Sequence, residues 1–299
     1  MLNQMEQPSN SSSNSSSSSS PYPPFVPCFT SEIKSLIISL SVAHALLLPL
    51  FLYVITVGYQ RWRKDGFLAP FTTWSHIDVF TYNVVFLDLF NIFGTFFYFL
   101  GAVTKRSDVQ MAGSGMFGVF FSGQTLFHLL TCMERYLAVV HPVSYLRLKG
   151  SAGVRARNVT VGCVWMVSIL IMALIVQRVI PFVIINVLLL SFTSLAFVFC
   201  SLSVLCALIG PGPGRTRNRV DQSKRRALNT ILIITGTLFL RFISSMISSI
   251  LQNVTSHFEY LYCLIGWSSV WFLVPSSLVL PLLFLQRAGK LTVCGAKIK

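Results

Sequence analysis

The sequence predicts an all-α membrane protein, built as a bundle of seven membrane-spanning helices. Of its 299 residues, 54% are hydrophobic and only 11% are charged, and the mean hydropathy is +0.69. Soluble domains carry about 25% charged residues, so this chain lacks the polar surface that a water-soluble domain needs. The apolar residues are also grouped into blocks of roughly 20 residues or more, the length that a helix needs to cross a bilayer.

The apolar blocks are expected at 35–59, 77–103, 109–140, 158–176, 182–209, 228–251 and 262–285. The fourth and fifth blocks are separated only by the residues 177–181, and one helix through both would be about 75 Å long. Basic residues at both ends of this stretch also require an even number of crossings. We therefore divide the chain into an extracellular tail (1–31), a seven-helix domain (32–286) and a short cytoplasmic tail (287–299).

The positions of Lys and Arg predict an outside N-terminus and a cytoplasmic C-terminus. Three basic residues follow the first block at 61–64, whereas the charges before it, Glu32 and Lys34, cancel. Most other basic residues lie in 147–157, in 215–226 and in the C-terminal tail. Seven crossings with an outside N-terminus place all three segments on the cytoplasmic side. The net charge of +14 therefore reflects cytoplasmic loops in contact with the lipid bilayer, and nucleic acid is not an expected partner.

Covalent modifications are predicted outside the helices. The tail 1–31 is rich in Ser and Pro and is expected to be disordered, with glycosylation sequons at Asn10 and Asn14. Cys28 and Cys263 stand at the outer ends of the first and seventh blocks, in the oxidising compartment, where they form either a disulfide or two free thiols. Cys294, close to the last block on the cytoplasmic side, is a candidate for palmitoylation.

The inner end of the third block carries the string Cys132-Met133-Glu134-Arg135-Tyr136-Leu137-Ala138-Val139-Val140-His141-Pro142. A Glu-Arg pair at the end of an uncharged helix either reaches the lipid headgroups or serves a function. The string resembles that of the rhodopsin-like (class A) G-protein-coupled receptors, whose third helix ends in Asp/Glu-Arg-Tyr and continues as Ala-Val-x-His-Pro. The resemblance implies that Glu134 holds Arg135 in the resting state, next to Tyr136, and that activation frees Arg135 toward a heterotrimeric G protein.

Further positions look like landmarks of the same family. Asp88 in the second block looks like the family's buried aspartate, which holds a sodium ion; a carboxyl group buried in its protonated form is the alternative. Asn91 and Gln124 are candidates for further oxygen ligands of that ion. Pro281 and Phe284 stand in an altered Asn-Pro-x-x-Tyr motif, where the proline is expected to kink the seventh helix.

The sequence also departs from the family. The stretch 230–249 contains neither Pro nor Trp, so the family's hinged aromatic switch is missing from the sixth helix. Neither the outer end of the third block nor the 177–181 connection contains Cys, so the family's common disulfide is missing too. Arg241 is an unusual charge within the sixth block, and it is an anchor for an anionic ligand, a partner of Asp88, or a side chain that reaches outward.

The expected function is that of a plasma-membrane receptor that transmits the signal of an unknown extracellular ligand to a G protein. The alternatives are a receptor-like protein without efficient G-protein coupling, or a small transporter or channel in which Asp88, Asn91, His128 and Arg241 would line one aqueous path. No GxSxG, HExxH or P-loop motif is present, so an enzyme is not expected. The segment 113–118 fits G-x-G-x-x-G by letter only, and its small residues predict close helix packing.

Overall fold

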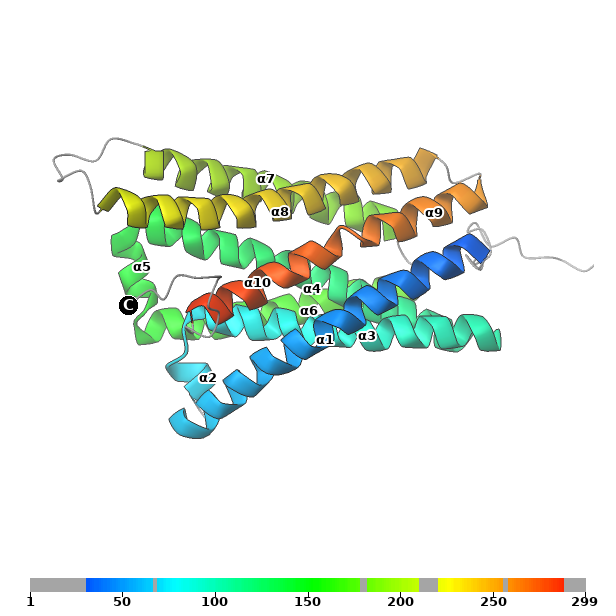
Figure 1. The fold of residues 1–299 in the computed structure, drawn as a ribbon, viewed down its shortest axis with the longest axis horizontal. Helices are drawn as coiled ribbons and strands as arrows, with labels where there is room; N and C mark the ends of the chain where they lie inside the picture. The colour runs from blue at the N-terminus through cyan, green and yellow to red at the C-terminus, as the bar shows by residue number, and fades with distance from the viewer. Residues whose placement is uncertain (1–30, 67–68, 178–181, 210–219, 255–257, 288–299) are drawn as a thin grey trace, which may run out of the picture.

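The chain folds into a bundle of long helices (Figure 1). The computed structural model describes residues 31–66, 69–177, 182–209, 220–254 and 258–287, and within these ranges every regular element is a helix. The long helices are α1 (Ser31–Asp65), α3 (His76–Thr104), α4 (Ser107–Val140), α6 (Ser151–Val176), α7 (Phe182–Ile209) and α8 (Val220–Val254), followed by α9 (Glu259–Val270) and α10 (Leu273–Arg287). The predicted all-α class is confirmed, as is the division of the fourth and fifth blocks into two helices.

Six candidate spans in the described residues are long and apolar enough to cross a membrane, as expected of a multi-pass membrane protein. Five of them are α1, α3, α4, α6 and α7, and the sixth is formed by α9 and α10 together. Helix α8 has 35 residues but is not one of the six, which are counted on the described residues alone. Arg241 lies within α8, and this charge lowers the mean hydropathy of the helix.

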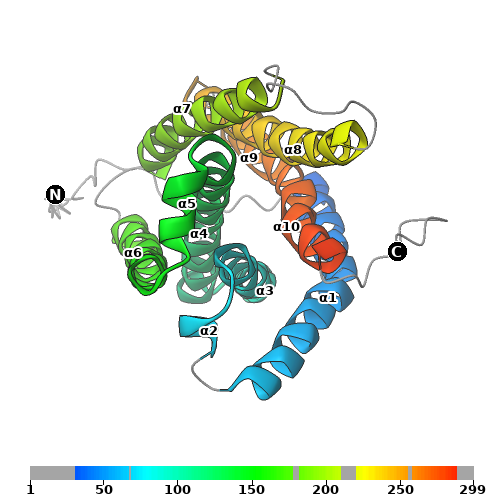
Figure 2. The same ribbon diagram turned by 90° about the vertical axis from the view of Figure 1, so that its left-hand side faces the viewer.

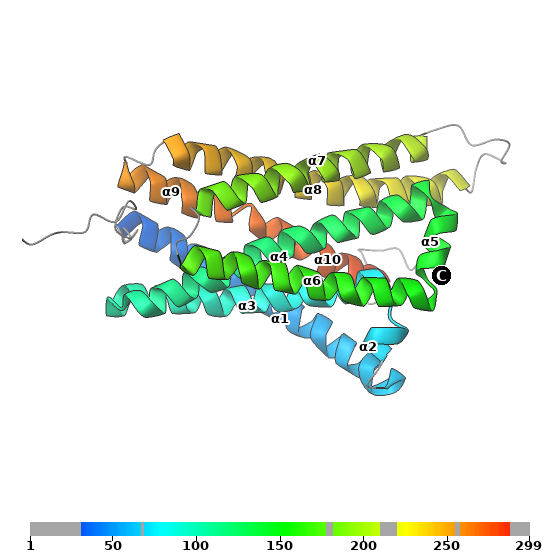
Figure 3. The ribbon, with the colours of Figure 1, turned by 180° about the vertical axis from the view of Figure 1, so that it is seen from behind.

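Helix α4 lies in the middle of the bundle. It contacts α3, α6 and α7, and 67% of its most apolar window is buried, against 17% for α6. Figure 2, viewed along the bundle, shows the other long helices around it. From behind, α6 runs beside α3 and α4 (Figure 3). Any site at the centre of the bundle is therefore built on α4 and the helices that pack against it.

Two short helices that the sequence did not predict lie at one end of the bundle. They are α2 (Ala69–Thr72) and α5 (Pro142–Leu148). Pro142 stands at the first position of α5, where its fixed φ suits a helix and its missing N–H costs nothing. The C-terminal turn of α10 and the first turn of α8 lie at this same end (Figure 1).

Near the turn that joins them, helices α3 and α4 pack closely at glycine positions. The chain turns within two residues, and Lys105 takes the left-handed conformation (φ 55°) with its N–H donated to the carbonyl of Gly101. A Cβ atom on Gly113 would lie 2.4 Å from the backbone nitrogen of Tyr98 and 2.7 Å from the carbonyl oxygen of Gly94. Only glycine fits at such a distance, so the predicted close packing is confirmed at Gly113.

The helix predicted over 262–285 is interrupted at Trp271 and Phe272, which separate α9 from α10. Pro275 follows in the first turn of α10, where it needs no hydrogen-bond partner. Pro281 lies inside α10, and the kink expected there stays a prediction. The interruption falls just before a pair of buried serines that contribute to the site described next.

Candidate functional site

A carboxyl group lies buried at the centre of the bundle. Asp88 of α3 is fully buried, and its Oδ1 atom accepts hydrogen bonds from Ser277 Oγ at 2.7 Å and from Gln124 Nε2 at 3.1 Å. Gln124 Nε2 also donates to Ser277 Oγ at 3.0 Å. The three residues come from α3, α4 and α10, so the carboxylate connects three helices.

A guanidinium group lies in the same region. Arg241 of α8 is the largest of the fully buried side chains among the described residues, and its Cζ atom lies 5.8 Å from the centroid of the Phe121 ring. Its Nη1 atom donates to Ser276 Oγ at 3.3 Å, and Nη2 donates to Thr125 Oγ1 at 3.1 Å. The complete burial contradicts the alternative that Arg241 reaches outward. An anionic ligand could reach it only if the bundle opened.

The carboxylate and the guanidinium are joined through two pairs of adjacent residues. Gln124 and Ser277 bind Asp88, whereas their chain neighbours bind Arg241. Among the described residues the two charges make no direct ion pair, but they attract each other electrostatically. We call this set the central polar cluster; it consists of Asp88, Gln124, Thr125, Arg241, Ser276 and Ser277.

The oxygen atoms of this region are of the type that binds a sodium ion, but the charge of the region does not suit one. Asp88 Oδ2, Gln124 Oε1 and Asn91 Oδ1 have no hydrogen-bond partner among the described residues, and such oxygens are suitable ligands for a hard cation. However, the guanidinium of Arg241 already balances the single carboxylate. A sodium ion would therefore add an uncompensated positive charge to a buried site, which is costly in a low dielectric.

The cavity found between α7 and α8 does not involve the residues named for the transporter alternative. His128 is fully buried, and neither of its ring nitrogens has a hydrogen-bond partner among the described residues. A cavity of about 210 Å³ between α7 and α8 is lined by apolar side chains such as Phe197, Phe242 and Met246, with Ser194 as its polar member. None of the residues named for the transporter alternative lines this cavity.

The Glu134-Arg135-Tyr136 string lies at the end of α4 that is close to α5. Glu134 is buried, and its Oε1 atom accepts a hydrogen bond from the hydroxyl of Tyr145 in α5 at 3.3 Å. The Tyr136 hydroxyl lies 3.2 Å from His141 Nε2, at the junction of α4 and α5. Helix α5 therefore holds this end of α4 in place, whereas the ion pair between Glu134 and Arg135 stays a prediction.

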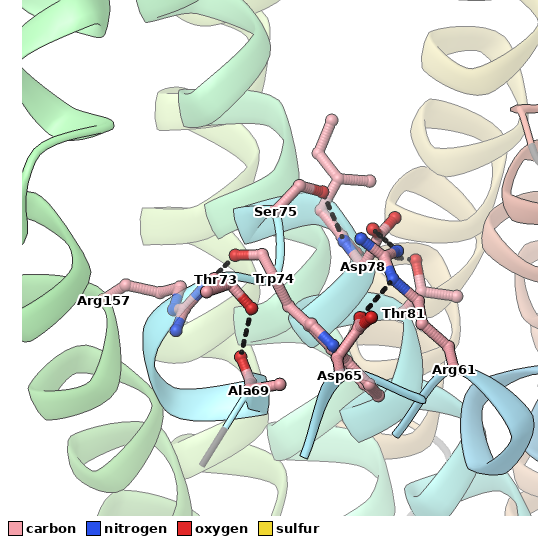
Figure 4. A network of polar contacts seen from close by, with 10 residues as sticks. Arg61, Asp65, Ala69, Thr73, Trp74, Ser75, Asp78, Thr81 and Arg157 are labelled. Atoms are coloured by element: carbon pink, nitrogen blue, oxygen red, sulfur yellow. Dashed lines mark hydrogen bonds and ion pairs between the residues drawn. The ribbon is translucent and has the colours of Figure 1, made fainter. Parts of the chain in front are cut away.

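A second polar network is built around Arg157 and the turn at Trp74 (Figure 4). Arg157 of α6 is buried and donates from Nη1 to the carbonyl oxygen of Trp74, in the turn between α2 and α3. It is also attracted electrostatically to Glu134. Arg61 of α1 binds Asp78 at 2.8 Å, and its Cζ atom lies 5.5 Å from the centroid of the Trp74 ring. The turn at Trp74 thus joins α1, α3 and α6 at one end of the bundle.

Several residues of the site could not be identified from the sequence. Thr125, Ser276 and Ser277 stand in apolar blocks, where hydroxyl groups ordinarily bond to the carbonyl four residues earlier. Ser276 and Thr125 do donate within their own helices, to Leu273 and Phe121, and offer only their lone pairs to Arg241. The adjacent serines after Pro275 were the one available signal.

The predicted modification sites lie largely outside the described residues. Asn10, Asn14, Cys28 and Cys294 all belong to such segments. Cys263, in α9, is buried and disulfide-bonded, and its pairing with Cys28 stays a prediction.

Peptide mapping under non-reducing conditions is expected to recover Cys28 and Cys263 in one linked peptide. Cys263 stands in the first turns of α9, at the end of the bundle where α1 begins (Figure 1). Cys132 and Cys200 provide the internal control, because both are free thiols in the structure and should be alkylated only after denaturation. Recovery of Cys28 as a free thiol would contradict the pairing.

No protein-family model matches the sequence, and no curated protein matches it. The resemblance to rhodopsin-like receptors therefore depends on the motif residues alone.

Proposed function

We propose that this protein is a seven-helix receptor of the rhodopsin-like type, which transmits an extracellular signal across the plasma membrane to a heterotrimeric G protein. The observation that carries the proposal is the Glu134-Arg135-Tyr136 string at the end of α4, the central helix of the bundle. The contact of Glu134 with Tyr145 supports it, because a buried acid at the end of a span is costly unless it has partners.

In this proposal α8 is the remaining membrane span, which gives seven crossings. The first turn of α8 and the short helices α2 and α5 lie at one end of the bundle (Figure 1). The basic residues at 61–64, at 147–157 and at 224–226 belong to that end, so it faces the cytoplasm. The N-terminal tail with its two sequons is then extracellular, and the protein is a glycoprotein.

The central polar cluster and the string at 134–136 share helix α4. Thr125 and Glu134 are nine residues apart, which is about 14 Å along a helix. A ligand that binds one arrangement of the bundle more tightly shifts the population toward it. Because α4 is continuous from one site to the other, a shift at the central polar cluster is transmitted to Arg135 and from there to the G protein.

The proposal is tested by replacing Arg135 with alanine. We expect Arg135→Ala to lower basal or ligand-driven G-protein activation by roughly tenfold, within the range of ordinary coupling free energies. Activation is measured in cells against each G-protein class, with surface expression determined in parallel. Arg147→Ala is the matched control, because Arg147 is an exposed arginine of α5 near the same end of the bundle.

An unchanged response of Arg135→Ala in every G-protein class, at equal surface expression, would contradict the receptor function. Ion or solute flux into liposomes that contain the purified chain would instead favour the transporter alternative. Measuring both separates the two classes of protein, because a receptor gives activation without flux.

A further inference from the structure

We propose that Arg241 is the built-in counter-cation of Asp88: its guanidinium takes the part of a sodium ion and attaches α8 to α4 and α10. The bundle would then be indifferent to sodium. The attachment concerns the fold alone, whereas its use as a switch depends on the receptor function proposed above.

The balance of charge is the first argument. Asp88 and Arg241 are both fully buried, and the central polar cluster contains one carboxylate and one guanidinium. An isolated buried charge is very unfavourable in a low dielectric, so in the ionised form that we propose for Asp88 each charge requires the other. The pair is complete without any ion from solution.

The hydrogen bonds are the second argument. Thr125 and Ser276 donate their hydroxyl hydrogens to backbone carbonyls, which turns their lone pairs toward Arg241. Gln124 and Ser277 turn their donors toward Asp88. Donors therefore face the anion and acceptors face the cation on both α4 and α10, which is the arrangement that a permanent carboxylate–guanidinium pair requires.

The place of Arg241 is the third argument. Helix α8 has no proline in its described residues and no tryptophan that could act as a hinged switch. It does have a charged side chain that crosses the bundle interior to bond with two other helices. Moving α8 outward would break both bonds and separate two charges in a medium without water. Arg241 thus holds α8 in the position that the structure shows.

The first test uses the unmodified full-length chain. Its thermal unfolding midpoint in detergent micelles is measured in sodium chloride and in choline chloride at equal ionic strength. We expect the same midpoint in both salts. A midpoint that rises with sodium would overturn the proposal, since it would show that the site still takes an ion.

The second test removes the guanidinium. Arg241→Gln is expected to lower the midpoint in choline chloride and to create a rise with sodium, because Asp88 Oδ2, Gln124 Oε1 and Asn91 Oδ1 are then available to a cation without repulsion. Arg241→Lys keeps a positive charge and is expected to stay indifferent to sodium. Arg155→Gln, at an exposed arginine of α6, is the matched control. No sodium effect in a folded Arg241→Gln would overturn the proposal.

A double-mutant cycle gives a third, independent measurement. Asp88→Asn and Arg241→Gln are each expected to destabilise the chain, because each leaves one buried charge without its partner. The double variant is expected to lose less than the sum of the two, with a coupling of at least tenfold in the unfolding equilibrium. Additive losses would overturn the pairing of the two residues.

These outcomes are distinguishable from those of the receptor function. If the pair holds α8 in an inactive position, Arg241→Gln also raises basal G-protein activation. If the sodium and coupling results are as expected while no variant activates any G protein, the counter-cation stands and the receptor function fails.

Discussion

Replacing Gly113 with alanine is expected to destabilise the bundle strongly. The new methyl group would lie 2.4 Å from the backbone nitrogen of Tyr98 and 2.7 Å from the carbonyl oxygen of Gly94, in a place where only backbone could move. Helices α3 and α4 would have to separate, and overpacking of this kind costs about 1–3 kcal/mol. We expect the upper end of that range, because no flexible side chain can give way.

Gly162→Ala is the matched control for this experiment. Gly162 also lies inside a long helix, α6, but a Cβ atom there would meet nothing within 4 Å. Alanine is a better helix former than glycine by about 1 kcal/mol, so this variant should be slightly more stable than the unmodified chain. Thermal unfolding in detergent measures both. Equal midpoints for the two variants would contradict the close packing of α3 on α4.

Replacing Arg157 with alanine is expected to loosen the end of the bundle where α2 and α5 lie. The side chain is buried, bonds to the carbonyl oxygen of Trp74 and to the amide oxygen of Asn158, and is attracted to Glu134. Its loss leaves the Trp74 carbonyl without that donor and removes one positive charge that attracts Glu134. Hydrogen bonds that involve a charged group contribute about 1.5–3 kcal/mol, which sets the expected loss of stability.

Arg155→Ala is the control for Arg157→Ala, because Arg155 lies two residues earlier on the same helix and is exposed. Amide hydrogen exchange is the informative measurement. In Arg157→Ala, exchange should increase at residues 72–76, in the turn between α2 and α3, and should stay unchanged near Asp88. Increased exchange in Arg155→Ala to the same extent would show that the effect is one of charge alone.

Much of the helical architecture could be predicted because a bilayer fixes the length and composition of each span. The division between α6 and α7 followed from length and from the basic residues at both ends of the apolar stretch. Which face of each helix points to the protein interior could not be predicted, because lipid and the protein interior both accept apolar side chains. Phe86 is 54% exposed and Phe120 is fully buried, yet both stand in apolar runs. Periodicity therefore carries little information about which face is inside.

Only the charged residues of the candidate site could be predicted from the sequence, because burying a charge inside a span is energetically costly. Asp88 and Arg241 attract notice in the sequence because a charge inside a span needs a reason. The hydroxyl residues that join them do not, since many others, such as Thr81 and Thr131, bond only within their own helices. Which serines and threonines face a charge depends on how the helices are rotated, and this is set by packing.

The unequal burial of the helices has a consequence for how such a chain can change over evolutionary time. A position on α6 that touches only lipid tolerates any apolar residue, whereas most positions along the apolar window of α4 are surrounded by other helices. Substitutions should accumulate quickly on the periphery and slowly along α4. Sequence similarity to related proteins would then persist longest in α4. Comparisons that give all spans equal weight would soon fail to detect it.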